Sequence, residues 1–391
     1  MTTGSVLHVV AWLGEADGVS VATKTMLEAL GKRSDWATTV LIGVFAESGR
    51  SFAAPGVDVV EMGGAIPFAG KLGPSTGYPP RFGSTMSKAL ARSDVVHLHG
   101  LWLYPTLVGS RIARRHGVPY LVSPHGSLMP GALIQKSWKK QIVLRTWERS
   151  NLNHAARLVA ASDTEAQAFV QLNLRAPTAV IPYALSAAAG DYLEPRARRR
   201  LTSANPDGNT LLTVGRFHPT KRFVELIDVF SRLADEYLNW RLVIVGSKDD
   251  PAYRTRVLHT AAGSPAASRI SVFEDMTGPE LWNLYLASEL FALPSLTENF
   301  GLVVIEALAA GTPVIATRGA PWLELEAQHC GWWIDTSVEA LAMTLKEAMS
   351  LSRSHLVSIG RRGIALVAAR YSPEAQGDAL ASLYETVRER H

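Results

Sequence analysis

Residues 293–317 read LPSLTENFGLVVIEALAAGTPVIAT. In this stretch an apolar run ends at a proline, a polar loop carries Glu298, and Gly301 opens a helical pattern that contains Glu306. A second apolar run follows the sequence Gly-Thr-Pro. Short apolar strands that alternate with helices are typical of βαβ units in a buried parallel sheet. The stretch therefore predicts an α/β fold with parallel strands.

The same alternation extends in both directions along the chain. Before this stretch come NTLLTVGRF, WRLVIVGS and RISVFEDM, separated by helical patterns such as RFVELIDVFSRLADEY and GPELWNLYLAS. An earlier series of strand-like runs reads VLHVVAWL, TTVLIGVF, DVVHLHG, PYLVSPHG, RLVAAS and TAVIPY. Residues 46–85 show little periodicity, and there we expect mostly loop around one strand, GVDVVEM. Two such series predict two Rossmann-like domains.

The alternation is interrupted at residues 186–210, which are small, polar and charged, as expected of a linker. We therefore predict an N-terminal domain over 1–188 and a C-terminal domain over 189–372. The last helical segment, 373–391, is expected to pack back on the N-terminal domain. Open parallel sheets bind ligands outside the carboxyl ends of their strands, so we expect a deep cleft between the two domains.

The composition limits the possible classes of protein. The chain of 391 residues has 47% hydrophobic and 19% charged residues, which is typical of a globular protein with large cores. It has no apolar run long enough to span a membrane and no signal-peptide pattern at its start. Its single cysteine, Cys330, excludes a disulfide framework and a multi-cysteine metal site. We therefore predict a cytoplasmic protein.

The net charge of +4 is mildly basic. Either it is an ordinary surface property, or it attracts a phosphorylated donor, a lipid-phosphate acceptor or a membrane surface. Nucleic acid is not expected, because no aromatic and basic platform accompanies the charge, and the RARRR run in the linker is interpreted as a solvated helix face. The basic segment 136–149, with Trp138 and Trp147, fits either a peripheral contact with the inner face of the membrane or a solvated helix face.

The start of the helix within 293–317 is a candidate anion site. Backbone N–H groups at a helix N-terminus are free to bind a phosphate, and a carboxylate further along the helix can hydrogen-bond a ribose diol. Glu298 lies just before this point and Glu306 about two turns beyond it. The candidate backbone donors are those of Asn299, Phe300, Gly301 and Leu302. The alternative is an amphipathic helix with solvated glutamates.

Two cations follow the first strand of the C-terminal domain, in the sequence LLTVGRFHPTKRFVELIDVF. Arg216 and Lys221 flank a short turn between a strand and a helix. Positive charges at such a turn can neutralise a diphosphate and stabilise it as it leaves. Two exposed surface cations are the alternative. The sequence Lys-Asp-Asp at 248–250 is interpreted as a surface loop rather than a metal-binding pair of carboxylates.

Histidines and a glycine loop lie near predicted strand ends of the N-terminal domain. His125, in LVSPHGSLMPGAL, is expected to point into the cleft, although a lone histidine is more often structural. His97 and His99 are expected to face opposite sides of their strand, one lining the cleft and one in the core, and no third ligand is close enough in sequence to suggest zinc. In the loop GEADGVSVATKTM, the backbone at Gly18 can approach a phosphate.

Together these features resemble the family 4 retaining glycosyltransferases of the GT-B fold. The hallmark of that family is a Glu, seven intervening residues and a second Glu, in a setting like ENFGLVVIEALAAGTPVIAT. The resemblance implies that Glu298 lies near the donor sugar hydroxyls and that Glu306 binds the ribose. It also implies that Arg216 and Lys221 hold the donor diphosphate and that His125 contacts the transferring sugar.

Two positions depart from the family pattern. Arg222 stands where a glycine often follows the lysine, and Asp17 precedes Gly18 where paired glycines are usual. The second departure leaves open which contact, with phosphate or with acceptor, this loop makes.

The resemblance implies a metal-independent enzyme without a cofactor. It would move a hexose, with retention of configuration and front-face departure of the nucleotide diphosphate, from a nucleotide-sugar donor held chiefly by the C-terminal domain. Bacterial members of the family commonly build polysaccharides on lipid carriers, so a glycan or lipid-linked acceptor in polysaccharide or cell-envelope synthesis is the leading expectation. The alternatives are a small-molecule acceptor, as in thiol or natural-product glycosylation, an epimerase or phosphorylase of the same fold, and a non-catalytic nucleotide-sugar-binding subunit.

Overall fold

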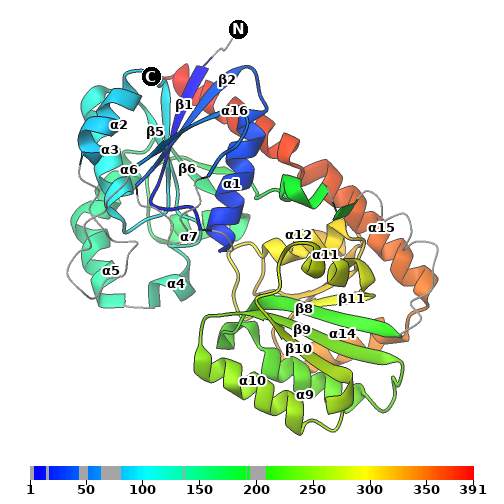
Figure 1. Ribbon diagram of the computed structural model, residues 1–391. Coiled ribbons are helices and arrows are strands. Elements are labelled where there is room, and N and C mark those ends of the chain that lie inside the picture. Colours follow the sequence, from blue (N-terminus) through cyan, green and yellow to red (C-terminus); the bar gives the residue numbers. More distant parts are fainter. Residues whose placement is uncertain are drawn as a thin grey trace. The chain divides into compact units, whose positions relative to one another are not determined.

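The structure is a computed structural model that describes residues 4–14, 17–43, 52–62, 81–134, 137–190, 192–193 and 208–391. The chain divides into two compact units (Figure 1). The N-terminal unit comprises Met1–Ser186 and Pro373–His391, and the C-terminal unit comprises Ala187–Ser372. Most of the predicted linker, including its RARRR run, lies outside the described residues.

The N-terminal unit contains a seven-stranded sheet in the order β3-β2-β1-β4-β5-β6-β7, and the strand pairs among its described residues are all parallel. The order reverses between β1 and β4, which makes this the topological switch point of the sheet. The strands are β1 (Gly4–Val10), β2 (Trp36–Ile42), β3 (Val57–Glu61), β4 (Val95–His99), β5 (Tyr120–Ser123), β6 (Arg157–Ala160) and β7 (Thr178–Val180).

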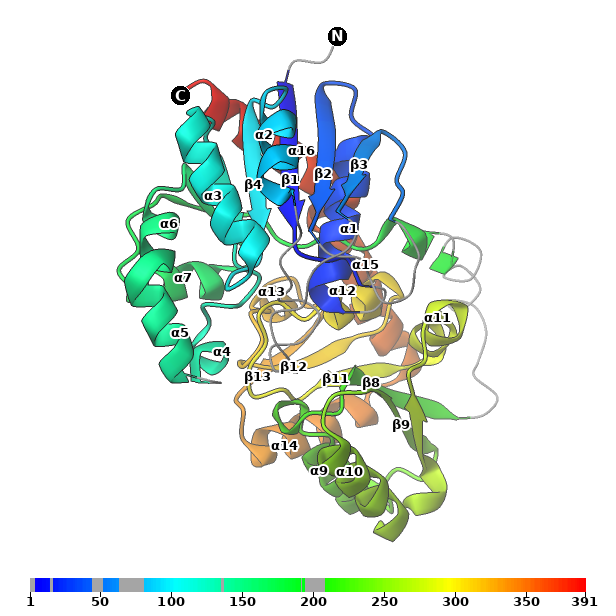
Figure 2. The same ribbon diagram turned by 60° about the vertical axis from the view of Figure 1, so that its left-hand side comes forward.

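Helices cover both faces of this sheet (Figures 1 and 2). Val6, Val95 and Leu121 pack with α1 and α16 on one face, whereas Leu7, Val96 and their neighbours pack with α2 and α3 on the other. This arrangement explains the nearly continuous apolar runs of the strands, because both faces are buried. The helices are α1 (Gly18–Gly31), α2 (Phe82–Leu90), α3 (Tyr104–His116), α4 (Pro130–Ile134), α5 (Ser137–Val143), a π-helical turn (Leu144–Glu148), α6 (Arg149–Asn153), α7 (Asp163–Gln171) and α16 (Pro373–Arg388).

The C-terminal unit contains a six-stranded sheet in the order β10-β9-β8-β11-β12-β13, also with parallel pairs and with its switch point between β8 and β11. The strands are β8 (Asn209–Arg216), β9 (Trp240–Ser247), β10 (Ile270–Glu274), β11 (Leu290–Leu293), β12 (Val314–Thr317) and β13 (Gly331–Ile334). The sequence patterns did not predict β13, because four residues with two tryptophans carry no readable period.

Three helices of the C-terminal unit, α9, α11 and α12, begin within one residue of where the patterns predicted them. In α9, which starts one residue after Arg222, seven of the eleven residues are buried, so its apolar face forms part of the core against β8 and β9. The helices are α9 (Phe223–Leu233), α10 (Pro251–Gly263), α11 (Gly278–Ala287), α12 (Leu302–Ala309), α13 (Glu324–Ala327), α14 (Val338–Ser350) and α15 (Arg353–Arg370), with 3-10 turns at Ala187–Ala189, Pro219–Lys221 and Ala267–Arg269. The prediction of two parallel-sheet, Rossmann-like domains is confirmed.

Among the described residues, no helix combines the length and the apolar character that crossing a bilayer requires.

Candidate functional site

The loops after β8 and β11 meet at the switch point of the C-terminal sheet. Since the two strands are parallel neighbours, both loops leave the same edge of the sheet. The backbone N–H of Leu296 donates to the carbonyl of Thr220 at 2.8 Å and so joins the loops directly. The predicted residues Lys221 and Glu298 therefore lie in one local site.

Lys221 and Glu298 form an ion pair through Nζ and Oε1. Their side chains are only 11% and 13% exposed. The hydroxyl of Ser295 donates to the same carboxylate oxygen at 2.7 Å, and the backbone N–H of Glu298 donates to the carbonyl of Gly319 at 2.8 Å. A Cβ at Gly319 would lie 2.5 Å from the carbonyl oxygens of Ser295 and Leu296, so the loop that carries Glu298 needs glycine there.

The start of α12 is built around a buried aromatic group. Phe300 is buried against Trp322 and Tyr371, and its carbonyl accepts the indole N–H of Trp322 at 2.6 Å. Gly301 has a φ of +87°, a backbone conformation that side chains disfavour, and the half-buried Leu302 begins the helix. The Phe300 side chain thus anchors the turn, and Asn299 lies beside it in the loop.

Glu306 lies one turn into α12 and is held by α11. The hydroxyl of Tyr285 donates to Oε2 of Glu306 at 2.7 Å. Burial raises the pKa of Glu306, and the hydrogen bond from Tyr285 opposes part of this rise. Glu298 and Glu306 are thus held by different partners, one by a cation and the other by a neutral hydroxyl.

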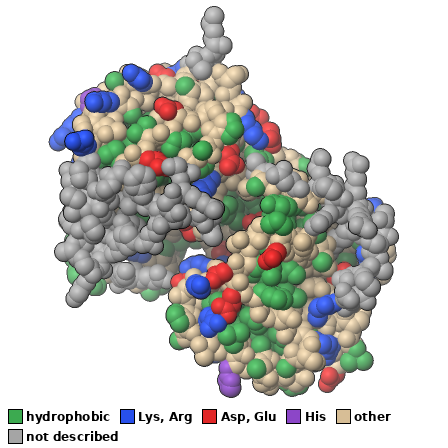
Figure 3. Space-filling view, in the orientation of Figure 1, with side chains coloured by type: hydrophobic (Ala, Val, Ile, Leu, Met, Phe, Trp, Pro, Cys, Tyr) green, Lys and Arg blue, Asp and Glu red, His purple; other side chains and the backbone are tan. Residues whose placement is uncertain are grey.

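Arg216 has a different ion-pair partner from Lys221. Its side chain is 60% exposed and pairs with Asp249 at 2.6 Å. Lys248 pairs with Asp275 at 3.1 Å, and the carboxylate of Asp250 caps α10. Each member of the sequence at 248–250 therefore has its own partner, and Figure 3 shows basic and acidic side chains next to one another on this unit.

Arg222 explains one departure from the family pattern. Its φ of +56° and ψ of +38° place it in the left-handed region, where glycine is the least strained residue. The side chain is buried, donates to the carbonyl of Thr336, and lies 3.6 Å from the carboxylate of Glu225. The turn that presents Lys221 thus imposes a glycine-like conformation, which the buried guanidinium contacts offset here.

His125 lies in the N-terminal unit, just after β5, and also has a positive φ, +52°. The backbone N–H of the following Gly126 donates to the buried carboxylate of Glu165, which holds the turn on α7. Both ring nitrogens of His125 have partners: Nδ1 lies 2.8 Å from the hydroxyl of Tyr183, and Nε2 lies 3.0 Å from Nδ1 of His99.

The expectation that His97 and His99 face opposite sides of β4 is wrong. Both rings are buried, and their centroids are 4.3 Å apart, because residues two apart in a strand share a face. The ring of His97 lies 2.8 Å from the hydroxyl of Tyr384 on α16 and 2.8 Å from that of Ser123. His8 on β1 joins them, since the sheet register places it beside His97.

His8 also changes the expectation about zinc. One ring nitrogen from each of His8, His97 and His99 lies within 4.8 Å of the others, a set able to hold a metal ion. The third histidine comes from a neighbouring strand, so its distance along the sequence was no guide. Burial lowers the pKa of His8 to about 3, and that of His125 to about 4 although the charge of Asp17 opposes that shift, so these rings are neutral at physiological pH.

Gly18 is the first residue of α1, directly after β1. Asp17 caps this helix, with its carboxylate accepting the backbone N–H of Ser20 at 2.9 Å. The hydroxyl of Ser20 in turn accepts the N–H of Gly14 at 2.8 Å. A carboxylate therefore occupies a position at this helix N-terminus that an anion would otherwise take.

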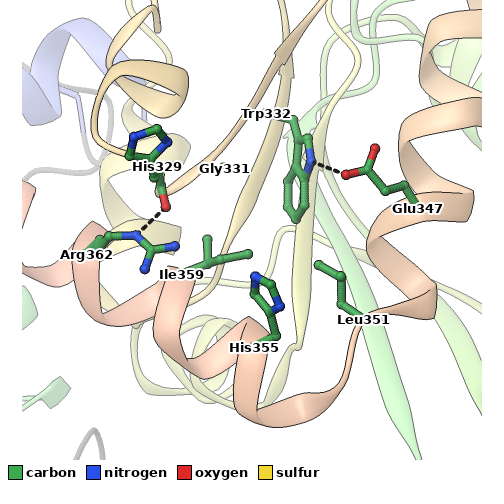
Figure 4. Close-up of a pocket in the computed structure, with 8 residues that line it drawn as sticks. All are labelled: His329, Gly331, Trp332, Glu347, Leu351, His355, Ile359 and Arg362. Atoms are coloured by element: carbon green, nitrogen blue, oxygen red, sulfur yellow. Dashed lines mark hydrogen bonds between the residues drawn. The ribbon is translucent and has the colours of Figure 1, made fainter.

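A separate pocket of about 460 Å³ lies in the C-terminal unit between β13, α14 and α15 (Figure 4). There the indole of Trp332 donates to Glu347 at 3.4 Å, and Arg362 donates to the carbonyl of His329 at 2.6 Å. His355 also lines it. None of the predicted site residues does, so its side chains offer matched controls for variants of the site.

Sequence reasoning missed several partners of the predicted residues. Ser295 and Tyr285, which bind Glu298 and Glu306, are ordinary polar residues without a motif. Tyr183 follows β7 in the sequence TAVIPY, and its place at a predicted strand end was the available signal. His8 had a similar signal, a histidine inside an otherwise apolar strand.

Comparisons with known proteins agree with this architecture. A family model described as "Glycosyl transferase 4-like domain" matches residues 17–184, and one described as "Glycosyl transferases group 1" matches residues 196–365. The D-inositol 3-phosphate glycosyltransferase of Mycobacterium leprae is 27% identical over 309 residues, which is 74% of this chain and 68% of the relative.

Two further proteins are informative. The GDP-mannose:cellobiosyl-diphosphopolyprenol alpha-mannosyltransferase of Xanthomonas campestris is 26% identical over 241 residues, 61% of this chain and 60% of the relative. Anabaena HepE, solved in complex with UDP-glucose, has a TM-score of 0.69 at 17% identity and covers 98% of this chain and 100% of its own. The last comparison shows the fold.

Two parallel Rossmann-like sheets of these topologies define the GT-B fold. Within this class, the chain belongs to the group 1 glycosyltransferases with a glycosyltransferase 4-like N-terminal domain. The predicted resemblance is thereby confirmed.

Proposed function

We propose that the protein transfers a hexose from a nucleotide-diphosphate sugar to a lipid-linked glycan acceptor, with retention of configuration, in polysaccharide or cell-envelope synthesis. The observation that carries the donor half is the shielded Lys221–Glu298 pair beside the start of α12, at the switch point of the C-terminal sheet. Switch points are where open parallel sheets bind nucleotides.

In the proposed complex, the cations bind the diphosphate of the donor and Glu298 binds its sugar. Lys221 exchanges its bond to Glu298 for one to the diphosphate, and Arg216 leaves Asp249 to bind the same group. Glu298 can then accept hydrogen bonds from hydroxyls of the donor sugar. The amides of Asn299, Phe300, Gly301 and Leu302 complete the anion site, and the two cations provide the charge stabilisation for which no metal is proposed.

In the transfer step, the bond between the anomeric carbon and the diphosphate oxygen breaks, and its electron pair stays on the diphosphate. The acceptor oxygen bonds to the same face of the sugar, and its proton passes to the departing diphosphate. Lys221 and Arg216 stabilise the negative charge that develops on the leaving group. This stabilisation is greatest in the transition state, so it raises the rate rather than only the affinity.

Two further residues are proposed to orient the donor. Glu306 accepts hydrogen bonds from the ribose hydroxyls, because its carboxylate is already fixed by Tyr285. His125 contacts the transferring sugar by exchanging the Tyr183 hydroxyl on Nδ1 for a sugar hydroxyl. Gly18 is proposed to let the backbone approach the acceptor rather than a phosphate, because Asp17 places negative charge there.

The lipid-linked acceptor is favoured by exposed apolar side chains in and just before the basic segment 136–149. Ile134, Trp138 and Ile142, four residues apart, are 76%, 64% and 51% exposed. Arg145 is also exposed in this segment. Exposed apolar side chains near a cation suit the surface of an anionic bilayer, where a polyprenol-linked acceptor resides. The Xanthomonas campestris relative carries a diphosphopolyprenol acceptor in its name.

A small phosphorylated polyol is the second candidate acceptor. The Mycobacterium leprae relative, named for inositol 3-phosphate, favours it.

The first measurement on the donor is a thermal-shift screen against UDP-, GDP- and ADP-sugars in EDTA. A donor at 100 times its dissociation constant is expected to stabilise the fold by about 2.7 kcal/mol. Glu306→Ala should abolish the shift, and His355→Ala, in the separate pocket, should keep it.

This screen, together with assays of donor conversion and of turnover on acceptors, decides between the proposed function and its alternatives. A shift that needs added magnesium contradicts metal independence, and no shift with any sugar nucleotide contradicts the donor assignment. Conversion of the sugar nucleotide to another one without an acceptor indicates an epimerase, and binding without turnover on any acceptor indicates a non-catalytic subunit.

The acceptor half is tested by sedimentation with vesicles that contain phosphatidylglycerol. Trp138→Glu should lower binding about tenfold or more, since it removes an interfacial aromatic group and adds a repelled charge. Val170→Glu is the matched control, because Val170 is 71% exposed on α7 of the same unit. Equal loss in both variants, or no binding by the unmodified protein, would favour the small soluble acceptor.

A further inference from the structure

His125 is the first of a row of three imidazoles that ends deep in the N-terminal sheet. Nδ1 of His8 lies 2.9 Å from Nε2 of His99, and Nδ1 of His99 lies 3.0 Å from Nε2 of His125. Nδ1 of His125 lies 2.8 Å from the hydroxyl of Tyr183. We name His8, His99, His125 and Tyr183 the imidazole row.

The ring geometry is that of a chain of hydrogen bonds. The rings of His8 and His99 are inclined by 15° with centroids 5.2 Å apart, and those of His99 and His125 by 14° at 5.3 Å. Nearly coplanar rings at this separation point a nitrogen of one ring at a nitrogen of the next. A bond between two imidazoles then requires one N–H and one lone pair.

The rings of the imidazole row are neutral. Burial lowers the pKa of each of the three histidines, for His8 to about 3 and for His125 to about 4. A neutral imidazole carries one N–H and one lone pair, so a proton on Nδ1 leaves Nε2 as an acceptor and the reverse. The tautomer of each ring thus dictates that of its neighbour.

Only two arrangements satisfy the two bonds between the rings. In one, all three rings carry the proton on Nδ1, and His125 donates to Tyr183. In the other, all three carry it on Nε2, and His125 accepts from Tyr183. The tautomer of any one ring therefore fixes the tautomers of the other two. At the far end, the buried Nε2 of His8 has no hydrogen-bond partner among the described residues.

A shared metal ion fits these distances less well. Zinc binds imidazole nitrogens at about 2.0–2.1 Å, which for tetrahedral ligands places the nitrogens about 3.3 Å apart. His8 and His99 approach to 2.9 Å with one nitrogen directed at the other. Both nitrogens of His97, the third possible ligand, already lie 2.8 Å from the hydroxyls of Ser123 and Tyr384.

We propose that His8 and His99 are positioning residues that set the tautomer of His125 and thereby decide whether its Nδ1 offers a proton or a lone pair to the substrate. The coupling of the three rings follows from their geometry and their neutral state and does not depend on the proposed function. Its effect on substrate rests on the proposed function, in which a sugar hydroxyl replaces Tyr183 on that nitrogen. His8 is on β1, two strands away from β5, and it acts on His125 through His99.

The coupling is tested by NMR on the whole protein labelled with 15N-histidine. Long-range proton–nitrogen correlations distinguish the two neutral tautomers, and single substitutions assign the signals. At pH 7 we expect His8, His99 and His125 to show the same tautomer, and to remain neutral at pH 5.5. Different tautomers among the three would overturn the proposal, and so would copurification of about one zinc ion per chain.

The effect on substrate is tested with a matched pair of variants. His99→Asn keeps an amide near the Nδ1 position that faces His125, whereas His99→Gln keeps one near Nε2 and loses that bond. With UDP-glucose as the probe, we expect His99→Gln to lower kcat of UDP release about tenfold at nearly unchanged KM, the scale of one lost hydrogen bond. His99→Asn should restore most of the rate.

Equal losses in the two variants would show a merely structural role and overturn the proposal. If no sugar nucleotide binds or turns over, the proposed function fails, while the tautomers measured by NMR still decide whether the row is coupled. Variants that do not fold leave the measurement on the unmodified protein decisive.

Discussion

The switch-point edges of the two sheets share a topology and differ in chemistry. At the C-terminal edge, Lys221 pairs with Glu298, and Arg216 pairs with Asp249. At the N-terminal edge, His8, His97, His99 and His125 are bonded to one another or to hydroxyls, and burial keeps them neutral. One edge holds cations that can exchange partners, and the other holds a fixed neutral network.

This difference indicates a division of labour between the two units. A diphosphate carries negative charge that two cations can neutralise, whereas sugar and acceptor hydroxyls need oriented neutral hydrogen-bonding groups. Asp17 sharpens the contrast, since it adds a carboxylate to the helix start at the N-terminal edge. The charged edge suits the donor diphosphate and the neutral edge suits the hydroxyls.

The strongest test of this division removes the cation of the shielded pair. Lys221→Met keeps much of the side-chain volume. It leaves Glu298 without its positive partner and removes the positive charge proposed to stabilise the leaving diphosphate. We expect kcat/KM to fall by about 10² to 10³, the scale of one lost transition-state donor. The measurement is steady-state release of nucleotide diphosphate with the donor found by thermal shift.

Lys346→Met is the matched control. Lys346 also pairs with a glutamate, Glu236 at 2.7 Å, but its side chain is 56% exposed. We expect little change there, because exposed ion pairs contribute little. A comparable loss of activity in both variants would show that the effect comes from general charge and would remove the basis of the division.

The second test uses acid, which should weaken the neutral edge first. Burial lowers the pKa of His8 to about 3 and that of His125 to about 4, although Asp17 opposes part of the second shift. Below about pH 6.5 these histidines take up protons in the unfolded chain but stay neutral in the folded protein. The free energy of unfolding therefore falls as the pH is lowered below about 6.5. From pH 6.5 to 5.5 the two histidines together should lower it by about 2 kcal/mol.

Hydrogen exchange measured by mass spectrometry separates the two edges. Peptides from β1 and β4 should exchange faster at pH 5.5 after correction for intrinsic rates, and peptides from β8 and β11 should change less. Equal pH dependence in both units would mean that the buried histidines don't control acid stability.

The neutral edge also shows where prediction from sequence stopped. Each run predicted as a strand contains an observed one, because apolar runs and their spacing report burial directly. The imidazole row depends instead on which strands are neighbours: β1 pairs with β4, and this register places His8 beside His97. No local pattern encodes that pairing, and the error about His97 and His99 came from misjudging the period of a strand.

The charged edge was easier to predict for a physical reason. Lys221, Glu298 and Glu306 lie in turns and helix starts whose glycines and prolines are visible in the sequence. Their mutual pairing and the roles of Ser295 and Tyr285 were not visible, since these depend on contacts between separate elements.

A third test asks whether Glu306 acts as an anion. Because burial raises its pKa, it takes up a proton at a higher pH than an ordinary glutamate. We expect donor affinity to fall as pH drops through that raised pKa, since the protonated form loses acceptor capacity for the ribose. Glu306→Gln should weaken binding by about 2 kcal/mol at neutral pH, the scale of a charged hydrogen bond.

Titration calorimetry of the two proteins across pH checks this expectation. The Gln variant should lose the part of the pH dependence that comes from Glu306. Tyr285→Phe removes the hydroxyl that favours the ionised form, so its decline should begin at a higher pH than in the unmodified protein. An identical pH profile in all three proteins would exclude Glu306 from the donor site.

The smallest expected effect concerns the strained turns that both edges contain. Arg222 at the charged edge and His125 at the neutral edge have φ values of +56° and +52°. A side chain in this region costs about 1 kcal/mol relative to glycine. At Arg222, glycine should relieve that strain but lose the buried contacts with Thr336 and Glu225, whereas alanine loses the contacts and keeps the strain.

We therefore expect Arg222→Gly to be more stable than Arg222→Ala by about 1 kcal/mol, measured by urea unfolding of the two variants. This order is the reverse of the one in a helix interior, where alanine is the more stable. Both variants should keep donor binding, because Arg222 is bonded to Thr336 and Glu225 and is not proposed to contact the donor. His125→Gly should instead lose activity while it relieves the same strain, because the ring is proposed to contact the transferring sugar. If alanine proved as stable as glycine at 222, the turn would relax without cost, and strain would no longer be a feature that the two edges share.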